Sequence, residues 1–211
     1  DTMRIVLSIP KNAYGEPIRS ADLVVYDHGT GGHAYNSVQR LNVHDQGRAI
    51  AQVFANAGVA VIGRDAPLYG QRFGLIDQGY SGGSPGYYNV VNLPAFRDNQ
   101  RQTALEGHIL IRFIQTALND SLPEGRVKTT GLRRFGHSLG SVTSHLGMAM
   151  DPDVHRSALM SGTGGLLTHY FLDTGLLADI GPDLISQLFT LFGAPIPDEV
   201  TTPKVMGAAL G

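Results

Sequence analysis

Short apolar runs of four to six residues recur along most of the chain, and each is followed closely by proline, aspartate or glycine. Runs of this length and ending are typical of strands buried in a sheet. Three longer stretches between them have the spacing of helices instead. The expected strands are Arg4–Ile9, Leu23–Tyr26, Val59–Ile62, Leu132–Phe135 and Ser157–Met160.

The first helical stretch ends near Gly58, which suits the position just past a helix, and Asp45 is its expected N-cap. The second is long, from about Arg97 to Asn119, and the third covers Ser141 to Met150. Because helices alternate with strands, the pattern predicts an α/β fold with a mainly parallel sheet and helices on both faces. The apolar face of the first helix consists of Ile50, Val53, Phe54 and Ala57, and that of the second of Leu105, Ile109, Phe113 and Ala117.

Two regions depart from this alternation. Residues 68–95 combine many glycines and prolines with four tyrosines, and a long loop of this kind is usually functional. Leu166 to Phe192 is helical and apolar, with breaks at glycine and proline. We therefore expect a core formed by residues 1–165 and a helical cap or lid segment formed by residues 166–211.

Composition narrows the function classes. The chain has 211 residues, of which 42% are hydrophobic and 16% charged, and this predicts a folded globular domain. A formal net charge of -2 gives no electrostatic attraction to nucleic acid or to an anionic membrane, and no apolar run is long enough to span a bilayer. Because the chain has no cysteine, disulfides and thiolate metal sites are excluded.

The strongest chemical signal is the motif Gly136-x-Ser138-x-Gly140, which lies between an expected strand and an expected helix. A serine on such a sharp turn adopts a strained backbone conformation, and glycines two residues away avoid clashes with the neighbouring strand and helix. The hydroxyl is then exposed at the N-terminus of the helix, which favours the negative charge that develops during nucleophilic attack. The motif predicts Ser138 as a catalytic nucleophile.

A second motif, His28-Gly29-Thr30-Gly31-Gly32, follows the second expected strand. Acyl transfer needs backbone N–H donors for the oxyanion, one from the residue after the nucleophile and one from an early loop between a strand and a helix. We expect Leu139 to provide the first donor and Thr30 the second, with Gly31 as the alternative. His28 is expected to brace this loop by a hydrogen bond and not to act as a base.

The same glycines also fit Gly29-x-Gly31-x-x-Ala34, the dinucleotide fingerprint of a nucleotide-dependent oxidoreductase. That interpretation requires an acid about 20 residues further on and a helix that starts at the glycines. Asp65 comes about 30 residues after Ala34, and the first helix is expected to start only near Asp45. We therefore favour acyl transfer and a structural role for Asp65. A hydrolase-like binding module without catalysis is the third alternative.

The two motifs resemble the nucleophile elbow and the oxyanion loop of α/β-hydrolase esterases and lipases, over residues 20–165. The segment Arg97-Asp98-Asn99-x-Arg101-Gln102 is also similar to a pattern in bacterial extracellular lipases of the virulence-factor group. The resemblance implies hydrolysis of a small-molecule or lipid ester through an acyl-enzyme on Ser138, without a cofactor or metal. Residues 68–95 and the cap would line the acyl or alcohol pocket. The pocket residues expected from them are Tyr69, Tyr87 and Phe171.

The family pattern places an acid and then a histidine on later loops, after further strands. None of the later histidines of this chain occupies such a loop, and none of the available acids follows an expected strand. These residues are His145, His155 and His169, and Asp173, Asp179, Asp183 and Asp198. We therefore expect the C-terminal strands of the sheet to be missing from this chain and a second polypeptide segment to complete the sheet and the triad. The chain alone would then be inactive.

Overall fold

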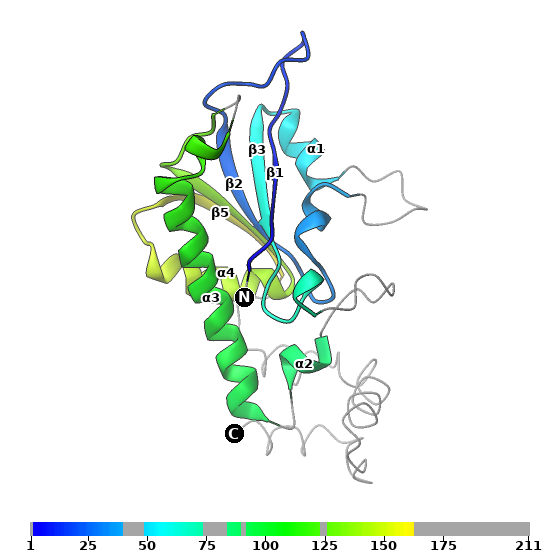
Figure 1. Ribbon diagram of the computed structural model, residues 1–211. Coiled ribbons are helices and arrows are strands. Elements are labelled where there is room, and N and C mark those ends of the chain that lie inside the picture. The colour runs from blue at the N-terminus through cyan, green and yellow to red at the C-terminus, as the bar shows by residue number, and fades with distance from the viewer. Residues whose placement is uncertain (1, 40–48, 74–83, 90–91, 123–125, 163–211) are drawn as a thin grey trace.

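The computed structural model describes residues 2–39, 49–73, 84–89, 92–122 and 126–162 (Figure 1). Their strands form a sheet with the spatial order β1-β3-β2-β4-β5. The strands are β1 (Ile5–Ser8), β2 (Asp22–Asp27), β3 (Val59–Arg64), β4 (Leu132–His137) and β5 (His155–Ser161). β1 runs antiparallel to β3 and the other pairs are parallel, so the mainly parallel sheet that the sequence predicts is confirmed.

Helices lie in the connections between the strands. The α-helices are α1 (Ile50–Ala55), α2 (Ser84–Tyr88), α3 (Leu93–Thr116) and α4 (Leu139–Met150), and the 3-10 helices are η1 (Ala34–Ser37), η2 (Gly70–Phe73) and η4 (Asn119–Ser121). Because η2 and α2 fall within residues 68–95, that stretch contains regular structure where a plain loop is expected. The expected cap, residues 166–211, lies outside the described residues. None of the helices described here combines the length and apolarity needed to cross a membrane.

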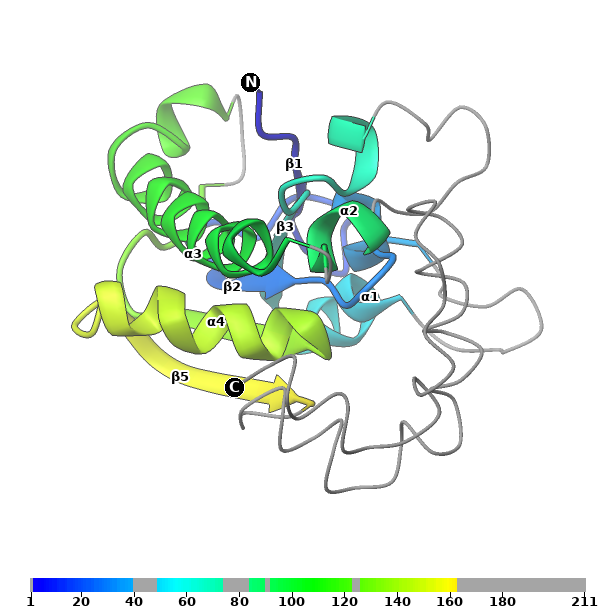
Figure 2. The ribbon, with the colours of Figure 1, turned by 90° about the horizontal axis from the view of Figure 1, so that it is seen from below.

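The two faces of the sheet are covered by different helices. Figure 2 shows α1 on the opposite side of the central strands from α3. Successive side chains of a strand point to opposite faces. Leu23 and Val25 of β2 accordingly pack in the cluster that includes α3, whereas Val24 and Tyr26 pack in the cluster that includes α1. α4 packs beside α3 and against β4. Helices on both faces confirm the expected α/β fold.

The buried face of α3 is only partly the one that the apolar spacing predicts, because Phe113 of the expected stripe packs against the core while other members do not. Leu105 and Ile109 of the expected stripe are 44% and 49% exposed. The face toward the sheet also contains Thr103 and Glu106, whose polar groups are satisfied by hydrogen bonds, so it does not stand out as an apolar stripe in the sequence. The apolar residues that α3 and the turn after it bury are Ala104, Leu110, Ile111, Ile114 and Leu118.

The helices α1 and α4 also differ from the prediction, α1 in the residues that it buries and α4 in the residue at which it begins. In α1, Ile50 and Phe54 of the expected face pack against the core, whereas Val53 is exposed and Ala51 is buried instead. Gly58 follows α1 with a φ of +71°, as expected for a glycine just past a helix, and the expected N-cap Asp45 lies outside the described residues. α4 starts two residues earlier than predicted, because it begins directly after Ser138.

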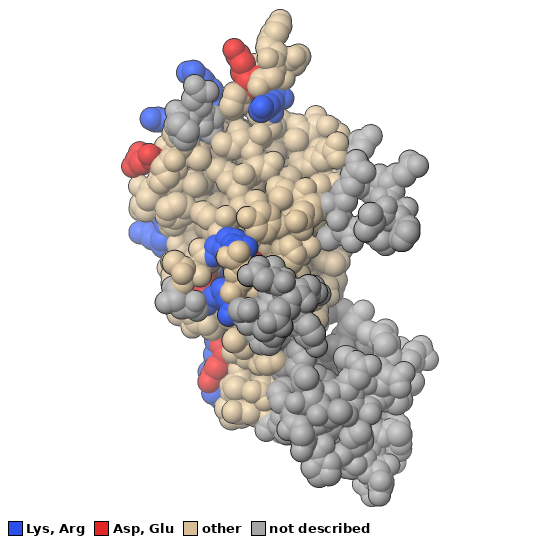
Figure 3. All heavy atoms as spheres, turned by 45° about the vertical axis from the view of Figure 1, so that its right-hand side comes forward, with Lys and Arg blue, Asp and Glu red and all other residues tan. Residues whose placement is uncertain are grey.

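Charges of both signs are interspersed on the face that Figure 3 shows. Over the part of the chain described there, no extended patch of one sign is seen. On this face the distribution agrees with the small net charge of -2.

Candidate active site

Ser138 lies at the junction between β4 and α4, on the sharp turn that the motif predicts. Its φ of 51° and ψ of -117° fall in a region that residues with a side chain rarely adopt, so the turn is strained. A Cβ atom at Gly140 would lie 2.1 Å from the carbonyl oxygen of Asp27, and one at Gly136 would lie 2.7 Å from that of Gly140. Both positions require glycine, because the atoms in the way belong to the backbone.

Hydrogen bonds fix the backbone of Ser138 on both sides. Its N–H donates to the carbonyl oxygen of Ser161 at 2.6 Å, and its carbonyl oxygen accepts from the N–H and the hydroxyl of Ser141 at 2.9 and 2.6 Å. A Cβ atom at Gly162, just after β5, would lie 2.9 Å from the Ser138 Cα. Ser138 is nevertheless exposed, so the turn is held in place while its hydroxyl stays accessible.

The glycine loop after β2, residues 29–32, packs directly against this turn. A Cβ atom at Gly29 would lie 3.1 Å from the Cβ of Ser138 and 2.8 Å from Nδ1 of His137. A side chain at Gly29 would therefore push the loop away from the serine. The two motifs that the sequence singles out meet in space at this contact.

The backbone N–H groups expected to form the oxyanion hole lie in these two segments. The N–H of Gly32 donates to the carbonyl oxygen of Gly29 at 3.0 Å, whereas those of Thr30 and Gly31 find no acceptor in the described part of the chain. In a planar trans peptide the N–H and the C=O point in opposite directions, so the Thr30 N–H points away from the Gly29 carbonyl. It therefore points away from the turn that the hydrogen bond between Gly32 and Gly29 closes. Leu139 is the first residue of α4, where an N–H has no intrahelical acceptor. The roles of Thr30 and Leu139 stay predictions that this geometry allows.

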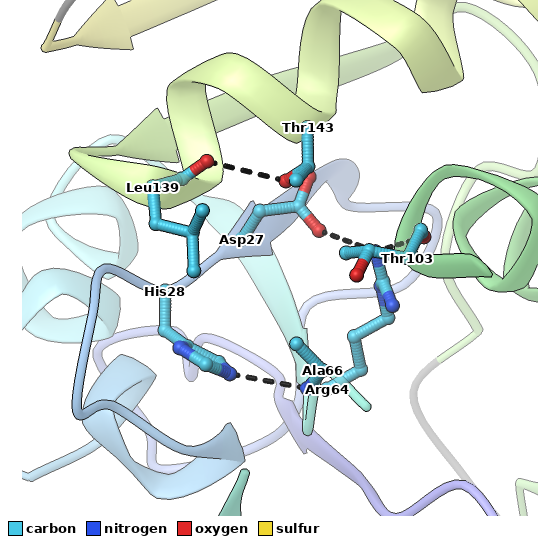
Figure 4. Close-up of a pocket in the computed structure, with 7 residues that line it drawn as sticks. All are labelled: Asp27, His28, Arg64, Ala66, Thr103, Leu139 and Thr143. Carbon is cyan, nitrogen blue, oxygen red and sulfur yellow. Dashed lines mark hydrogen bonds and ion pairs between the residues drawn. The ribbon is translucent and has the colours of Figure 1, made fainter. Parts of the chain in front are cut away.

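His28 braces the glycine loop from inside the protein. The N–H of Ala66 donates to its Nε2 at 3.1 Å (Figure 4). The ring proton is therefore on Nδ1, which donates to the carbonyl oxygen of Gly29 at 2.7 Å. Burial lowers the pKa of His28 to about 4, which keeps the ring neutral. With both nitrogens engaged in hydrogen bonds to the backbone, His28 has the expected bracing role.

Asp65 is also structural. Its buried carboxylate accepts a hydrogen bond from the N–H of Ala34 at 2.6 Å and so holds the end of the glycine loop against the end of β3. Ala34 opens η1, which has only four residues, and α1 begins at Ile50. In the described residues no long helix starts at the glycines, so the helix N-terminus that a dinucleotide pyrophosphate needs is not formed there.

A buried ion cluster lies beneath the loop, formed by Asp27, Arg64, Arg134 and Ser144 and termed the Asp27 cluster here. Arg64 Nη2 is 3.1 Å from Asp27 Oδ1, and Arg134 Nε and the Ser144 hydroxyl donate to Asp27 Oδ2 at 2.8 and 2.5 Å. Burial by itself raises the pKa of Asp27, but the charges of Arg134 and Arg64 and the Ser144 hydroxyl hold it at about 2. The carboxylate is therefore ionised.

The Asp27 cluster borders a small cavity behind the loop, which Figure 4 shows. Sequence analysis does not identify this cluster. The signal for it is the presence of Arg64 and Arg134 within strands of the sheet, because a buried charge requires a partner. Ser138 is not among the residues that line the cavity, so it is not a substrate pocket. The lining residues are Asp27, His28, Arg64, Ala66, Thr103, Leu139 and Thr143.

Tyr69 and Tyr87 do not line a substrate pocket, and this prediction is wrong. Both are completely buried and pack with Ala66 and Leu139, their ring centroids 5.0 Å apart. Aromatic rings bury large apolar areas, so these two support the loop and the start of α4 from behind. The third residue of that prediction, Phe171, lies outside the described residues.

No described histidine hydrogen-bonds the Ser138 hydroxyl. His145 Nδ1 is 2.6 Å from the carbonyl oxygen of Ser141. His155 pairs with Leu132 at the start of β4, so it lies at the end of the sheet opposite the elbow. No group of His, Asp and Glu in the described ranges could hold a metal ion. The remaining candidates lie outside the described residues: His169, Asp173, Asp179, Asp183 and Asp198.

Comparison with known proteins shows similarity in structure only. No family model and no curated protein matches the sequence. A Mycobacterium tuberculosis protein named as a non-heme bromoperoxidase matches 93% of this chain and 51% of its own, with a TM-score of 0.50 and 15% identity. A Bacillus coagulans carboxyl esterase matches 99% of this chain and 60% of its own, with a TM-score of 0.48 and 18% identity. A lipase in its open form matches 93% of this chain and 55% of its own, with a TM-score of 0.44 and 16% identity.

The topology and one of these comparisons together establish the fold. The sheet order, the helices on both faces and the likeness to the bromoperoxidase define the α/β-hydrolase fold. The chain spans between 51% and 60% of the length of the three similar structures.

Replacing His28 by glutamine is expected to weaken the pH dependence of stability. Burial lowers the pKa of His28 from 6.5 to about 4, so between these values the unfolded state binds more protons. The free energy of unfolding therefore decreases as pH falls from 6.5 towards 4. Urea unfolding at about pH 7.5 and about pH 4.5 measures the loss, which should be smaller in the variant. His33 and His155 titrate in the same direction, so some dependence remains. An equal loss of unfolding free energy in the wild type and the variant would contradict the lowered pKa of His28.

Proposed function

We propose that this protein is a serine hydrolase that cleaves carboxylic esters through an acyl-enzyme on Ser138. One observation carries the proposal: a strained turn exposes Ser138 beside a glycine loop whose Thr30 N–H has no acceptor in the described residues. Strained backbone persists only where the surroundings enforce it, and it concentrates at active sites. Here the enforcing contacts come from Gly136, Gly140 and Gly162.

The chemistry follows from this arrangement. The hydroxyl oxygen of Ser138 attacks the ester carbonyl carbon, and a histidine base takes the hydroxyl proton. The carbonyl oxygen becomes an oxyanion that accepts hydrogen bonds from the N–H groups of Thr30 and Leu139, next to the positive end of the α4 dipole. Collapse of the intermediate expels the alcohol, which takes the proton from the base. Water activated by the same base then hydrolyses the acyl-serine.

The base and its acid are proposed to come from outside the described residues. Within this chain, His44 and His169 lie there, and a second polypeptide segment that completes the sheet is the other source. In the described sheet β5 is an edge strand, which is the place where a further strand would pair.

A fluorophosphonate probe tests the proposal, because it phosphonylates only an activated serine. The probe is applied to the native protein, whose intact mass also shows whether a second polypeptide accompanies the chain. We expect one adduct, mapped to Ser138 by peptide mass spectrometry, and none in Ser138→Ala. The matched control Ser157→Ala changes an exposed serine of β5 and should label like the wild type. A folded protein without an adduct on Ser138 would refute the proposal.

A further inference from the structure

The side chain of Thr30 is tied to a residue far along the chain. Its Oγ1 forms a hydrogen bond with the hydroxyl of Tyr88, the last residue of α2. Thr30 is exposed and lies between Gly29 and Gly31, so few other contacts restrain this part of the loop. Building on the proposed function, we propose that Tyr88 is a positioning residue that fixes the Thr30 N–H for the oxyanion of the transition state.

Tyr88 is itself anchored to α3. Its ring packs on Tyr87 and on Phe96 of α3, with centroids 5.6 and 5.8 Å away. The Tyr87 hydroxyl hydrogen-bonds that of Thr103 at 2.7 Å, and the side-chain amide of Asn99 donates to the Tyr87 carbonyl at 2.8 Å. Burial also raises the pKa of Tyr88, so its hydroxyl keeps its proton at neutral pH. The hydrogen bond therefore connects the glycine loop to a long, packed helix.

The loop is then held from two sides. His28 fixes the Gly29 carbonyl, which belongs to the same planar peptide unit as the Thr30 N–H. Tyr88 fixes the Thr30 side chain at the other end of that unit. An oxyanion donor is effective only within about 2.7–3.1 Å of the oxyanion, so a small rotation of this peptide weakens catalysis. Among the described side chains, His28 and Tyr88 are the ones that hydrogen-bond to the Gly29 carbonyl and to Thr30, whereas Asp65 holds the loop further on, at Ala34.

Two hydroxyl deletions test the proposal by ester kinetics. Tyr88→Phe keeps the packed ring, and Thr30→Val keeps the shape of the partner. Each should lower kcat about tenfold, which is less than the roughly 10²–10³-fold cost of deleting an oxyanion donor. KM and the melting temperature should stay unchanged, and affinity for a boronic acid that forms a tetrahedral serine adduct should fall by the same factor as kcat/KM. Tyr88→Phe also removes the hydrogen bond between Tyr88 and Tyr69, whereas Thr30→Val removes only the one between Thr30 and Tyr88. The double variant should therefore be no slower than Tyr88→Phe alone, because Thr30→Val adds no further loss.

The control Tyr35→Phe deletes the hydroxyl of a tyrosine that does not contact Thr30 in the described structure, and it should behave as wild type. Unchanged kcat and boronate affinity in Tyr88→Phe would overturn the positioning role while leaving the proposed function standing. A fall in melting temperature that accompanies the fall in kcat in both Tyr88→Phe and Thr30→Val would also overturn the positioning role, because the two hydroxyls would then stabilise the fold. Absence of wild-type hydrolysis and of fluorophosphonate labelling would instead refute the proposed function itself.

Discussion

A Ser138→Ala variant is expected to lose ester hydrolysis, with kcat lower by roughly 10⁴ to 10⁶-fold. Without the hydroxyl no acyl-enzyme forms, and only binding and the oxyanion donors remain to assist attack by water. Stability should change little, because the exposed Ser138 side chain makes no hydrogen bond with the described residues and alanine keeps the Cβ atom. The measurements are kcat and KM for a p-nitrophenyl ester and the thermal midpoint of unfolding.

A matched substitution separates chemistry from folding in this experiment. Ser157→Ala removes a hydroxyl from an exposed position of β5 and should leave kcat and the thermal midpoint unchanged. Turnover by Ser138→Ala at the wild-type rate would show that Ser138 is not the nucleophile. A large fall in its thermal midpoint would show that the elbow turn depends on the serine side chain, which the geometry does not predict.

The strands were predictable because each is a short run closed by a turn residue, and most of the runs are apolar. Leu23–Tyr26 and Leu132–Phe135 fall inside β2 and β4, whose parallel pairing is expected from the alternation with helices. Helix faces were less predictable. α3 has apolar residues on two sides, and its buried side includes Thr103 and Glu106, so spacing alone selects a stripe that is only partly buried. Tertiary hydrogen bonds decide which side is buried, and these cannot be read from local sequence.

The elbow and the glycine loop were predictable because each needs glycine at fixed spacing, which leaves a local signal. The interactions that hold them are not local. Tyr88 is 58 residues from Thr30, and Arg134 is 107 residues from Asp27. The tyrosines of residues 68–95 suggest a pocket wall, whereas Tyr69 and Tyr87 are buried beneath the site. The sequence motifs therefore locate the candidate site, and the structure is needed to find the residues packed around it.

Asp27→Asn is expected to lower the free energy of unfolding by about 3–5 kcal/mol. Asparagine keeps the shape of the side chain but removes the carboxylate that pairs with both Arg64 and Arg134, which leaves Arg64 only the more distant Glu106 at 3.9 Å. Both guanidinium groups are almost completely buried, so water cannot replace the lost carboxylate. The pKa of Asp27 is about 2, so its charge stabilises the fold above pH 3.8, and this contribution is lost as pH falls towards 2. Urea unfolding at neutral pH measures the effect.

Asp22→Asn is the matched control, because Asp22 is in the same strand and also has a pKa of about 2. Its carboxylate is bound by Arg133 and Lys128 at 2.7 and 2.6 Å, but the site is partly exposed. Solvent screens such pairs, so this variant should lose at most about 1 kcal/mol. Equal losses in Asp22→Asn and Asp27→Asn would contradict the view that burial makes the Asp27 cluster important. Adding Arg134→Met to Asp27→Asn should recover part of the loss, because the substitution removes an unbalanced buried charge and fills most of its volume.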